Sequence, residues 1–240
     1  MYTALFGGYE RLLEQPVARA SGVDFVCFTD DPTLSSESWQ VRLVDAPFPD
    51  DSVRSARAVK IGGARLLGDH DVSLWIDNCV ILQRDPREFV ALLGDGDMVL
   101  PFHSFRASLR DEYIAVLRAG LDDPDIVRRQ WRLIDSAGLG AARPHWTAIL
   151  TRRNVPAVHD AMRTWLDEVL RHSRRDQLSF EYAMSRAGFE FSSLTIDNRV
   201  SHLHVWTPIE QLDRRLETRR WSPPLGADPE QRDRAPVAEH

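Results

Sequence analysis

The chain has 240 residues, of which 43% are hydrophobic and 28% are charged, as in ordinary soluble globular proteins. Its formal net charge of -6 gives no overall attraction to nucleic acid, so any phosphate site has to be local. Apolar runs long enough to span a membrane are absent from the sequence, and the segment from Met1 to Gly8 lacks the basic start of a signal peptide. Cys27 and Cys79 fit a reducing compartment. We therefore expect a cytoplasmic protein, either free or peripheral at the inner membrane.

Short apolar segments alternate with helical patterns along the chain. In chain order, the patterns predict strands over 2–6, 24–29 and 39–44, a helix over 53–68 capped by Asp51 or Ser52, and a central strand over 72–82. A short helix over 86–93, a strand over 97–102, helices over 109–119 and 123–137, and a strand over 146–151 follow. Strands that alternate with helices in one chain predict the α/β class, in a single domain over 1–220.

The clearest helical pattern begins after Asn154, a plausible N-cap with Pro156 in the first turn. Its apolar residues recur at helical spacing from Val158 to Leu170, which predicts a helix that packs on the core. A second helix is predicted from Ser173 to Gly188, followed by a strand over 189–195. The segment 221–240 is rich in Pro, Gly and charge and predicts a mobile tail.

The most informative segment runs from Ser73 to Asn78, where an apolar stretch ends in a carboxylate and an amide. Such a stretch is typical of a strand buried on both faces, and Asp77 then lies at the rim of the sheet, where open α/β folds bind ligands. Asp77 is a candidate ligand for Mg²⁺ or Mn²⁺. A turn or capping role is the alternative, because Asp and Asn are common in turns.

A basic ridge precedes this strand. Arg54, Arg57 and Lys60 are spaced at i, i+3 and i+6 on the predicted helix, and Lys60 is the only lysine in the chain. Guanidinium and ammonium groups are suited to phosphate, so the ridge is a candidate site for a diphosphate. A solvated helix face is the alternative interpretation.

Three further groups are weaker candidates. Asp176, beside Arg175 and Gln177, would serve as a base or bind a sugar hydroxyl, although Ser173 and Asp176 also have the spacing of a capping box. His202 and His204 share one face of an extended segment, where a metal-ligand role competes with a structural one, and His103 has a similar, weaker claim. The first strand is followed by Gly7, Gly8 and Tyr9. This segment would let a ribose or base approach the backbone.

Five blocks in order carry a resemblance to a known family. They are Tyr2 to Tyr9, Val26 to Asp30, the Arg54, Arg57 and Lys60 ridge, Leu74 to Asp77, and Arg175 to Phe180. In this order they resemble a family of glycosyltransferases that includes plant mucilage-related and turgor-regulating members and bacterial polysaccharide-cluster proteins. The resemblance spans residues 2–190.

The resemblance implies a GT-A-like nucleotide-diphospho-sugar transferase domain with a mixed, mostly parallel sheet flanked by helices. It further implies a nucleotide-sugar donor, often UDP-linked, a glycan or other hydroxyl acceptor, and a divalent cation, Mn²⁺ or Mg²⁺. Asp77 and Asp176 would be the catalytic carboxylates, and Asp77 with His204 would hold the metal. The implied donor-binding residues are Phe6, Gly7, Gly8, Tyr9, Thr29, Asp30, Arg54, Arg57, Lys60, Asp77, Asn78, Arg175 and Gln177.

The chain departs from the usual Asp-x-Asp metal motif, because Cys79 stands where the second Asp is expected. If no metal is bound, the basic ridge has to stabilise the leaving diphosphate. We predict a hexosyltransferase, with a non-catalytic nucleotide- or glycan-binding member of the same fold as the alternative. A phosphatase-type hydrolase with Asp30 or Asp77 as nucleophile does not fit, because Pro32 and Cys79 occupy the positions of its second carboxylate.

The acceptor side is expected within residues 103–145. Its polar and aromatic candidates are Phe105, Arg106, Tyr113, Trp131 and His145, for which a packing role is the alternative.

Overall fold

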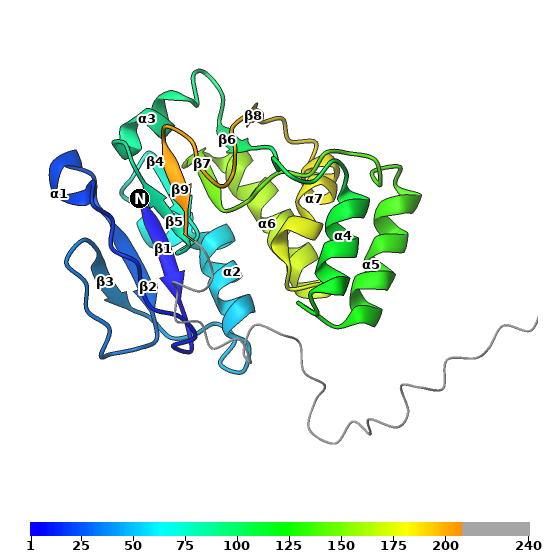
Figure 1. Cartoon of the computed structure of the whole chain (residues 1–240), viewed down its shortest axis with the longest axis horizontal. Helices are drawn as coiled ribbons and strands as arrows, with labels where there is room; N and C mark the ends of the chain where they lie inside the picture. The colour runs from blue at the N-terminus through cyan, green and yellow to red at the C-terminus, as the bar shows by residue number, and fades with distance from the viewer. Residues whose placement is uncertain (208–240) are drawn as a thin grey trace, which may run out of the picture.

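The computed structural model describes residues 1–207, apart from the side chains of 64 and 65. Seven strands form the main sheet in the order β3-β2-β1-β4-β7-β6-β8, and β7 alone in that sheet runs antiparallel to its neighbours (Figure 1). The strands are β1 (Tyr2–Leu5), β2 (Val26–Thr29), β3 (Gln40–Leu43), β4 (Val72–Ile76), β6 (Met98–Pro101), β7 (Ile149–Arg153) and β8 (Ser192–Leu194). The predicted α/β class, with a mixed and mostly parallel sheet flanked by helices, is confirmed.

The helices of the described chain are α1 (Ala18–Ser21), α2 (Ser52–Gly62), α3 (Pro86–Ala91), α4 (Leu109–Arg118), α5 (Pro124–Ser136), α6 (Pro156–Arg171) and α7 (Phe180–Ala187). Two 3₁₀ turns, η1 (Gly63–Leu67) and η2 (Asp176–Leu178), precede β4 and α7. None of these helices is long and apolar enough to cross a membrane.

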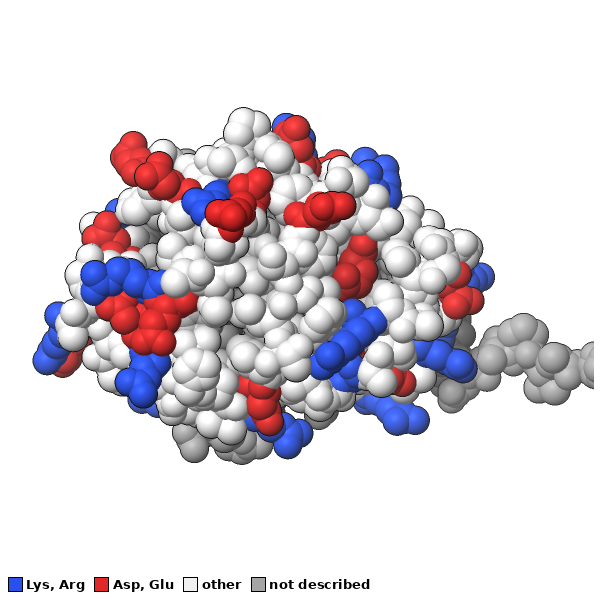
Figure 2. Space-filling model, turned by 90° about the horizontal axis from the view of Figure 1, so that it is seen from above, with Lys and Arg blue, Asp and Glu red and all other residues white. Residues whose placement is uncertain are grey.

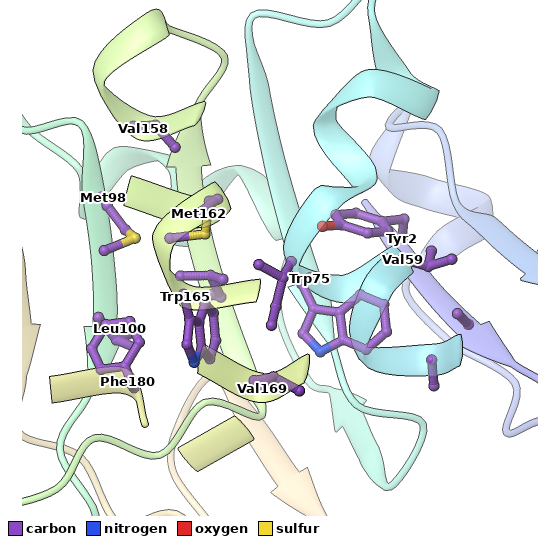
Figure 3. Close-up of a cluster of buried hydrophobic side chains, with 14 of the residues drawn as sticks. Tyr2, Val59, Trp75, Met98, Leu100, Val158, Met162, Trp165, Val169 and Phe180 are labelled. Carbon is purple, nitrogen blue, oxygen red and sulfur yellow. The ribbon is translucent and has the colours of Figure 1, made fainter. Parts of the chain in front are cut away.

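Both faces of the sheet are covered, because successive strand residues point to opposite sides. Trp75 of β4 packs with α2, α6 and α7 in one buried cluster, whereas Leu74 and Ile76 join a second cluster with α3. Figure 3 shows the first cluster, in which Trp75 lies beside Val169 of α6 and Tyr2 of β1 lies beside α2. The predicted two-sided burial of this strand is confirmed.

The predicted central strand over 72–82 is wrong in extent, since it is divided at Asp77. The backbone N–H of Asp77 still donates to Ala148, and a turn in which Val80 N–H donates to the Asp77 carbonyl then redirects the chain. The continuation, β5 (Val80–Leu82), pairs with β9 (His204–Trp206) in a separate two-stranded sheet. The break leaves Asp77 at the end of β4.

The predicted helix over 53–68 is also shorter. Asp51 caps α2 by accepting from the N–H of Arg54, as predicted, but the α-helix ends at Gly62 and continues as η1. The Tyr2 ring packs so closely that a Cβ on Gly63 would lie 2.7 Å from its Cε2 atom. The helix end is further held by Arg152, which donates to the carbonyls of Lys60 and Ile61.

The predicted helix from Ser173 to Gly188 begins later, and its capping box is wrong. Instead of capping a helix, Ser173 Oγ donates to Asp122 Oδ2 at 2.5 Å. The Arg174 N–H donates to the same carboxylate. These bonds hold the segment extended, so that η2 and α7 follow as two short elements. Gly188 ends α7 in the left-handed conformation, with φ of 59°.

Smaller differences concern element ends. The N-cap position of α6 is Val155 and not Asn154, whose amide donates to the His70 carbonyl instead. The predicted strand over 146–151 is shifted to β7, the one over 189–195 shortens to β8, and α1 and β9 were not predicted as elements. The predicted tail over 221–240 lies outside the described residues.

Candidate active site

One edge of the main sheet carries the candidate site. The carboxyl ends of the parallel strands β1, β4 and β6 meet there, together with the beginning of the antiparallel β7. A cavity of about 290 Å³ opens at this edge. It is lined by Tyr9 after β1, Asp77 after β4, His103 after β6 and Thr147 before β7. This position is where open α/β sheets bind ligands.

A buried lysine organises the floor of the site. Lys60 is fully buried and its Nζ lies 2.6 Å from Asp176 Oδ2 and 3.3 Å from Asp77 Oδ1. The same atom donates to Thr147 Oγ1 at 3.1 Å and lies 5.8 Å from the centroid of the Trp75 ring. The single lysine of the chain therefore joins two carboxylates that are distant in sequence. Lys60 does not line the cavity, so it supports the site from below.

Arg57 is the second cation of the cluster. Its Nε lies 2.7 Å from Asp176 Oδ1 and its Nη1 lies 3.8 Å from Asp77 Oδ1, and the residue lines the cavity. The approach of Nε is an ion pair outside hydrogen-bond geometry, so Nε has no hydrogen-bond partner among the described residues. Burial opposes the charge of Arg57, but Asp176 and Asp77 outweigh it and raise its pKa. Arg57 thus stays charged at the cavity wall.

The carboxylates of Asp77 and Asp176 are ionised because the neighbouring cations stabilise their negative charge. Burial alone would raise the pKa of Asp176, but Arg57 and Lys60 outweigh burial and lower it. Burial also works against ionised Asp77, whose pKa is nevertheless lowered by Lys60 and Arg57 and by the hydrogen bond from Trp75 Nε1. Such strongly shifted groups gathered at a cavity are a mark of functional sites.

Arg175 is the third cation of the cluster. Its guanidinium lines the cavity, and its buried Nε has no hydrogen-bond partner in the described part of the chain. Burial and repulsion from Arg57 lower the pKa of Arg175. Arg57, Lys60 and Arg175 face Asp77 and Asp176, and Arg175 also interacts with Glu112 of the cavity lining. The guanidinium groups of Arg57 and Arg175 at the cavity are suited to an anion. On the face of the molecule in Figure 2, by contrast, acidic and basic side chains are interspersed around a largely uncharged centre.

The predicted donor-binding residues after β1 and β2 lie at the same edge of the sheet. Asp30 Oδ1 accepts from Gly7 N–H at 3.0 Å, which ties the two loops together. Gly7 and Gly8 have φ of 67° and 55°, the left-handed region that glycine adopts readily. Tyr9 lines the cavity, whereas Phe6 and Thr29 are buried beneath it and do not.

The basic ridge divides into members with different surroundings. Arg54 pairs with Asp51 at 2.8 Å and donates to the carbonyl of His172, so it links α2 to the end of α6 and does not line the cavity. The three ridge residues therefore do not face one ligand together. Gln177 and Asn78 line the cavity, although the Asn78 amide is fully engaged with Leu13 N–H, Glu10 and the Arg11 carbonyl.

Aromatic rings form another part of the cavity lining. Phe105 stacks on Trp206 with a centroid distance of 5.9 Å and an interplanar angle of 11°, and Trp146 meets Trp206 edge to face. The ring centroids of His103 and Phe105 lie 4.3 Å apart, in an edge-to-face arrangement. Flat apolar rings of this kind are suited to the faces of sugars or bases.

The acceptor candidates predicted from the sequence divide into two groups. Phe105 and Arg106 line the cavity. Tyr113, Trp131 and His145 have packing roles: Tyr113 donates to the Leu178 carbonyl and contacts Trp131, and His145 is held by Glu181 and Ser193.

Among the lining residues that sequence reasoning missed are Glu112, Trp146, Thr147 and Trp206. Thr147 lies shortly before β7, and the antiparallel pairing of β7 with β4 brings it to the ligand edge. Glu112 lies on α4 and contacts Arg106 at 3.0 Å, and burial raises its pKa. Only tertiary packing brings these residues to the edge of the sheet.

The residues do not fit a resident divalent cation well. No group of three or more His, Cys, Asp and Glu side chains in the described part of the chain is arranged to hold a metal ion. Both ring nitrogens of His204 are engaged, with Ser201 Oγ and the Asn198 carbonyl, and burial lowers its pKa. Both oxygens of Asp176 are held by Arg57, Lys60 and Thr147. The contacts of His204 are those of a structural histidine, and its metal role stays a prediction.

Comparison with known families agrees with this geometry. The model of the family described as TOD1/MUCI70, glycosyltransferase-like domain matches residues 3–197. The chain belongs to this family. The matched range contains Lys60, Asp77 and Asp176, and the family resemblance predicted from five sequence blocks is confirmed. Membership makes the chain glycosyltransferase-like. None of the curated proteins compared with the chain matches it.

Two solved structures are similar to parts of this chain. WbbM, described as a bifunctional glycosyltransferase in its apo form, is 9% identical with a TM-score of 0.39, and the match covers 72% of this chain and 33% of that one. Core-mannan synthase A (CmsA/Ktr4) from Aspergillus fumigatus, in an Mn/GDP form, is 10% identical with a TM-score of 0.39 and coverages of 67% and 60%. The chain therefore spans less than two thirds of the length of either protein.

Proposed function

We propose that this chain transfers a hexose-type sugar from a nucleotide-diphosphate donor, UDP-linked, to a hydroxyl group of a glycan. The observation that carries the proposal is the polar cluster at the ligand edge of the sheet. There, Arg57 and Arg175 line a cavity, and the Nε of Arg175 has no hydrogen-bond partner among the described residues. Guanidinium groups with free donors are suited to phosphate oxygens.

The proposed reaction is a displacement at the anomeric carbon. The acceptor hydroxyl oxygen forms a bond to that carbon and loses its proton, while the bond from the carbon to the diphosphate oxygen breaks and the nucleoside diphosphate leaves with the electron pair. Arg57 and Arg175 would stabilise the negative charge that develops on the leaving diphosphate. Removal of one such preorganised donor typically costs about 10²–10³ in kcat.

Asp176 suits positioning better than proton transfer. Both of its oxygens are occupied by cations or by Thr147, and its lowered pKa makes it a weak base. Glu112 is the better proton acceptor among the described lining carboxylates, because burial raises its pKa. Asp77, at the cavity with a quarter of its side chain exposed, would bind a donor hydroxyl.

A non-catalytic binding role is the second candidate. It is favoured by one observation: Asn78, next to Asp77, has its whole amide committed to the backbone and to Glu10. Such a member would bind nucleotide or glycan without transfer, and only the first candidate predicts turnover of a nucleotide sugar.

Thermal stability in the presence of a panel of nucleotides and nucleotide sugars tests the donor site. A ligand at a hundred times its Kd stabilises the folded state by about 2.7 kcal/mol, which is a visible shift. We expect a shift with UDP or a UDP-sugar that is reduced in Arg175→Gln and retained in Arg54→Gln, since Arg54 does not line the cavity. A panel without any shift would contradict the proposed function.

A further inference from the structure

The two carboxylates at the ligand edge are already neutralised by the protein itself. Lys60 Nζ lies within 3.3 Å of both Asp77 and Asp176, and Arg57 approaches both as well. A divalent cation that used these carboxylates would have to displace a fully buried ammonium group. Displacing such a group exposes an unpaired charge in a low-dielectric site, which is costly.

Two other residues considered as ligands, Asn78 and His204, are also occupied. The Asn78 carbonyl oxygen accepts from Leu13 N–H, and its amide donates to Glu10 Oε1 and the Arg11 carbonyl. His204 has a partner on each ring nitrogen. The interactions that the described residues make with Asp77 all fall on Oδ1, so Asp77 Oδ2 is the one exception. Mg²⁺ is usually held by one or two protein carboxylates together with phosphate oxygens and water. The Asp77 carboxylate, which would serve here, is already paired with Lys60 and Arg57.

The charge that a cation would supply is present in the side chains. Arg57 and Arg175 line the cavity; the Arg57 Nε is paired with Asp176, whereas the buried Nε of Arg175 lacks a hydrogen-bond partner in the described part of the chain. We propose that this site binds the diphosphate of its donor without a divalent cation, through Arg57 and Arg175, with Lys60 holding the two carboxylates beneath. The inference rests on the proposed function, because it concerns the same donor.

Substitution of Asp77 distinguishes diphosphate binding with a metal from binding without one, because the affinity is expected to change in opposite directions. If Asp77 held a metal, Asp77→Asn would weaken diphosphate binding about tenfold or more. Without a metal, the same change removes a negative charge beside the cavity, so diphosphate binding is unchanged or tighter. Inorganic pyrophosphate is the appropriate probe, because it carries no ribose or sugar hydroxyl that Asp77 would contact.

The experiment is calorimetric titration of the full chain with UDP and with pyrophosphate, in EDTA and then in Mn²⁺ or Mg²⁺. For each probe, we expect the Kd in EDTA and the Kd in Mn²⁺ or Mg²⁺ to agree within about threefold. Arg175→Gln should weaken both about ten- to a hundredfold, whereas Arg174→Gln, which alters a residue held by Asp122, should not. Thermal denaturation of each variant checks that it is folded.

Three outcomes overturn the inference in distinguishable ways. UDP binding that appears only with Mn²⁺ or Mg²⁺, or tightens tenfold or more with them, contradicts the metal-free site and leaves the proposed function intact. Loss of pyrophosphate binding in folded Asp77→Asn contradicts it equally. Absence of UDP binding in every condition contradicts the proposed function and the inference together.

Discussion

Lys60 is the residue whose removal most sharply tests how the site is built. The Lys60→Met variant keeps the volume of the stem but leaves Asp77 and Asp176 close together without the ammonium between them. Because Lys60 is fully buried and Asp176 is 3% exposed, removal of the ammonium leaves two carboxylates that share Arg57 as their remaining ion-pair partner. Breaking a buried pair in this way costs about 3–5 kcal/mol. For a chain of this size, that corresponds to a fall in Tm of roughly 6–20 °C.

The loss of folding stability in Lys60→Met, called the deficit below, should be larger at high pH than at low pH. In the unaltered chain, the pKa values of Asp77 and Asp176 are lowered, so their contribution to stability is present above the unfolded pKa of about 3.9 and is lost as pH falls through the lowered values. In Lys60→Met, loss of the ammonium charge raises both pKa values relative to the unaltered chain, so the folded variant keeps its carboxylates protonated to a higher pH. The deficit is therefore larger near pH 8 than near pH 5.

The assay is urea or thermal denaturation of both proteins at the two pH values. Arg54→Met is the matched control on the same helix, because the Arg54–Asp51 pair is partly exposed and its loss should cost about 0–1 kcal/mol. A Lys60→Met deficit as small as that of the control, or equal at both pH values, would refute the buried ion cluster.

Three further predictions concern packing, positioning and proton transfer. Gly63→Ala places a Cβ against the Tyr2 ring and should destabilise the fold by about 1–3 kcal/mol, whereas Gly62→Ala, which meets open space, should not; denaturant midpoints compare the two. Asp122→Ala releases the segment before Asp176 and should lower the transfer rate up to about a hundredfold, with less effect on nucleotide affinity in titrations. Glu112→Gln should lower kcat by about 10²–10⁴ and remove the acidic limb of the pH profile of kcat. Because the pKa of Glu112 is raised, that limb lies at higher pH than for an ordinary Glu. An unchanged profile would exclude Glu112 as the proton acceptor.

Local sequence patterns predicted the strands that build the site. The apolar run before Asp77 and the capped helix that carries Arg57 and Lys60 have strong local signals, and both appear close to their predicted positions. The spacing of the basic residues correctly indicated a shared helix. It did not reveal that Arg54 turns to the end of α6 or that Lys60 is fully buried, because those outcomes depend on what α2 packs against.

Non-local contacts explain most of the remaining differences. The capping box at Ser173 is wrong because Asp122, 51 residues earlier, takes the Ser173 hydroxyl, and no local pattern reports such a partner. Trp146 and Trp206 come together from separate parts of the chain, so their joint contribution to the cavity was not predictable from either segment. Thr147 falls inside the strand predicted over 146–151, and the antiparallel pairing that brings it to the cavity was not predictable from that segment either.

The central claim, that the cavity turns over a nucleotide sugar, is tested most directly by release of the nucleoside diphosphate. Purified chain would be incubated with a panel of UDP-hexoses, with and without glycan acceptors, and free UDP would be measured over time. The account predicts slow UDP release without acceptor, faster release with the right acceptor, and loss of both in Arg175→Gln. A chain that binds UDP but releases none from any UDP-hexose would contradict the transferase and leave a nucleotide-binding protein.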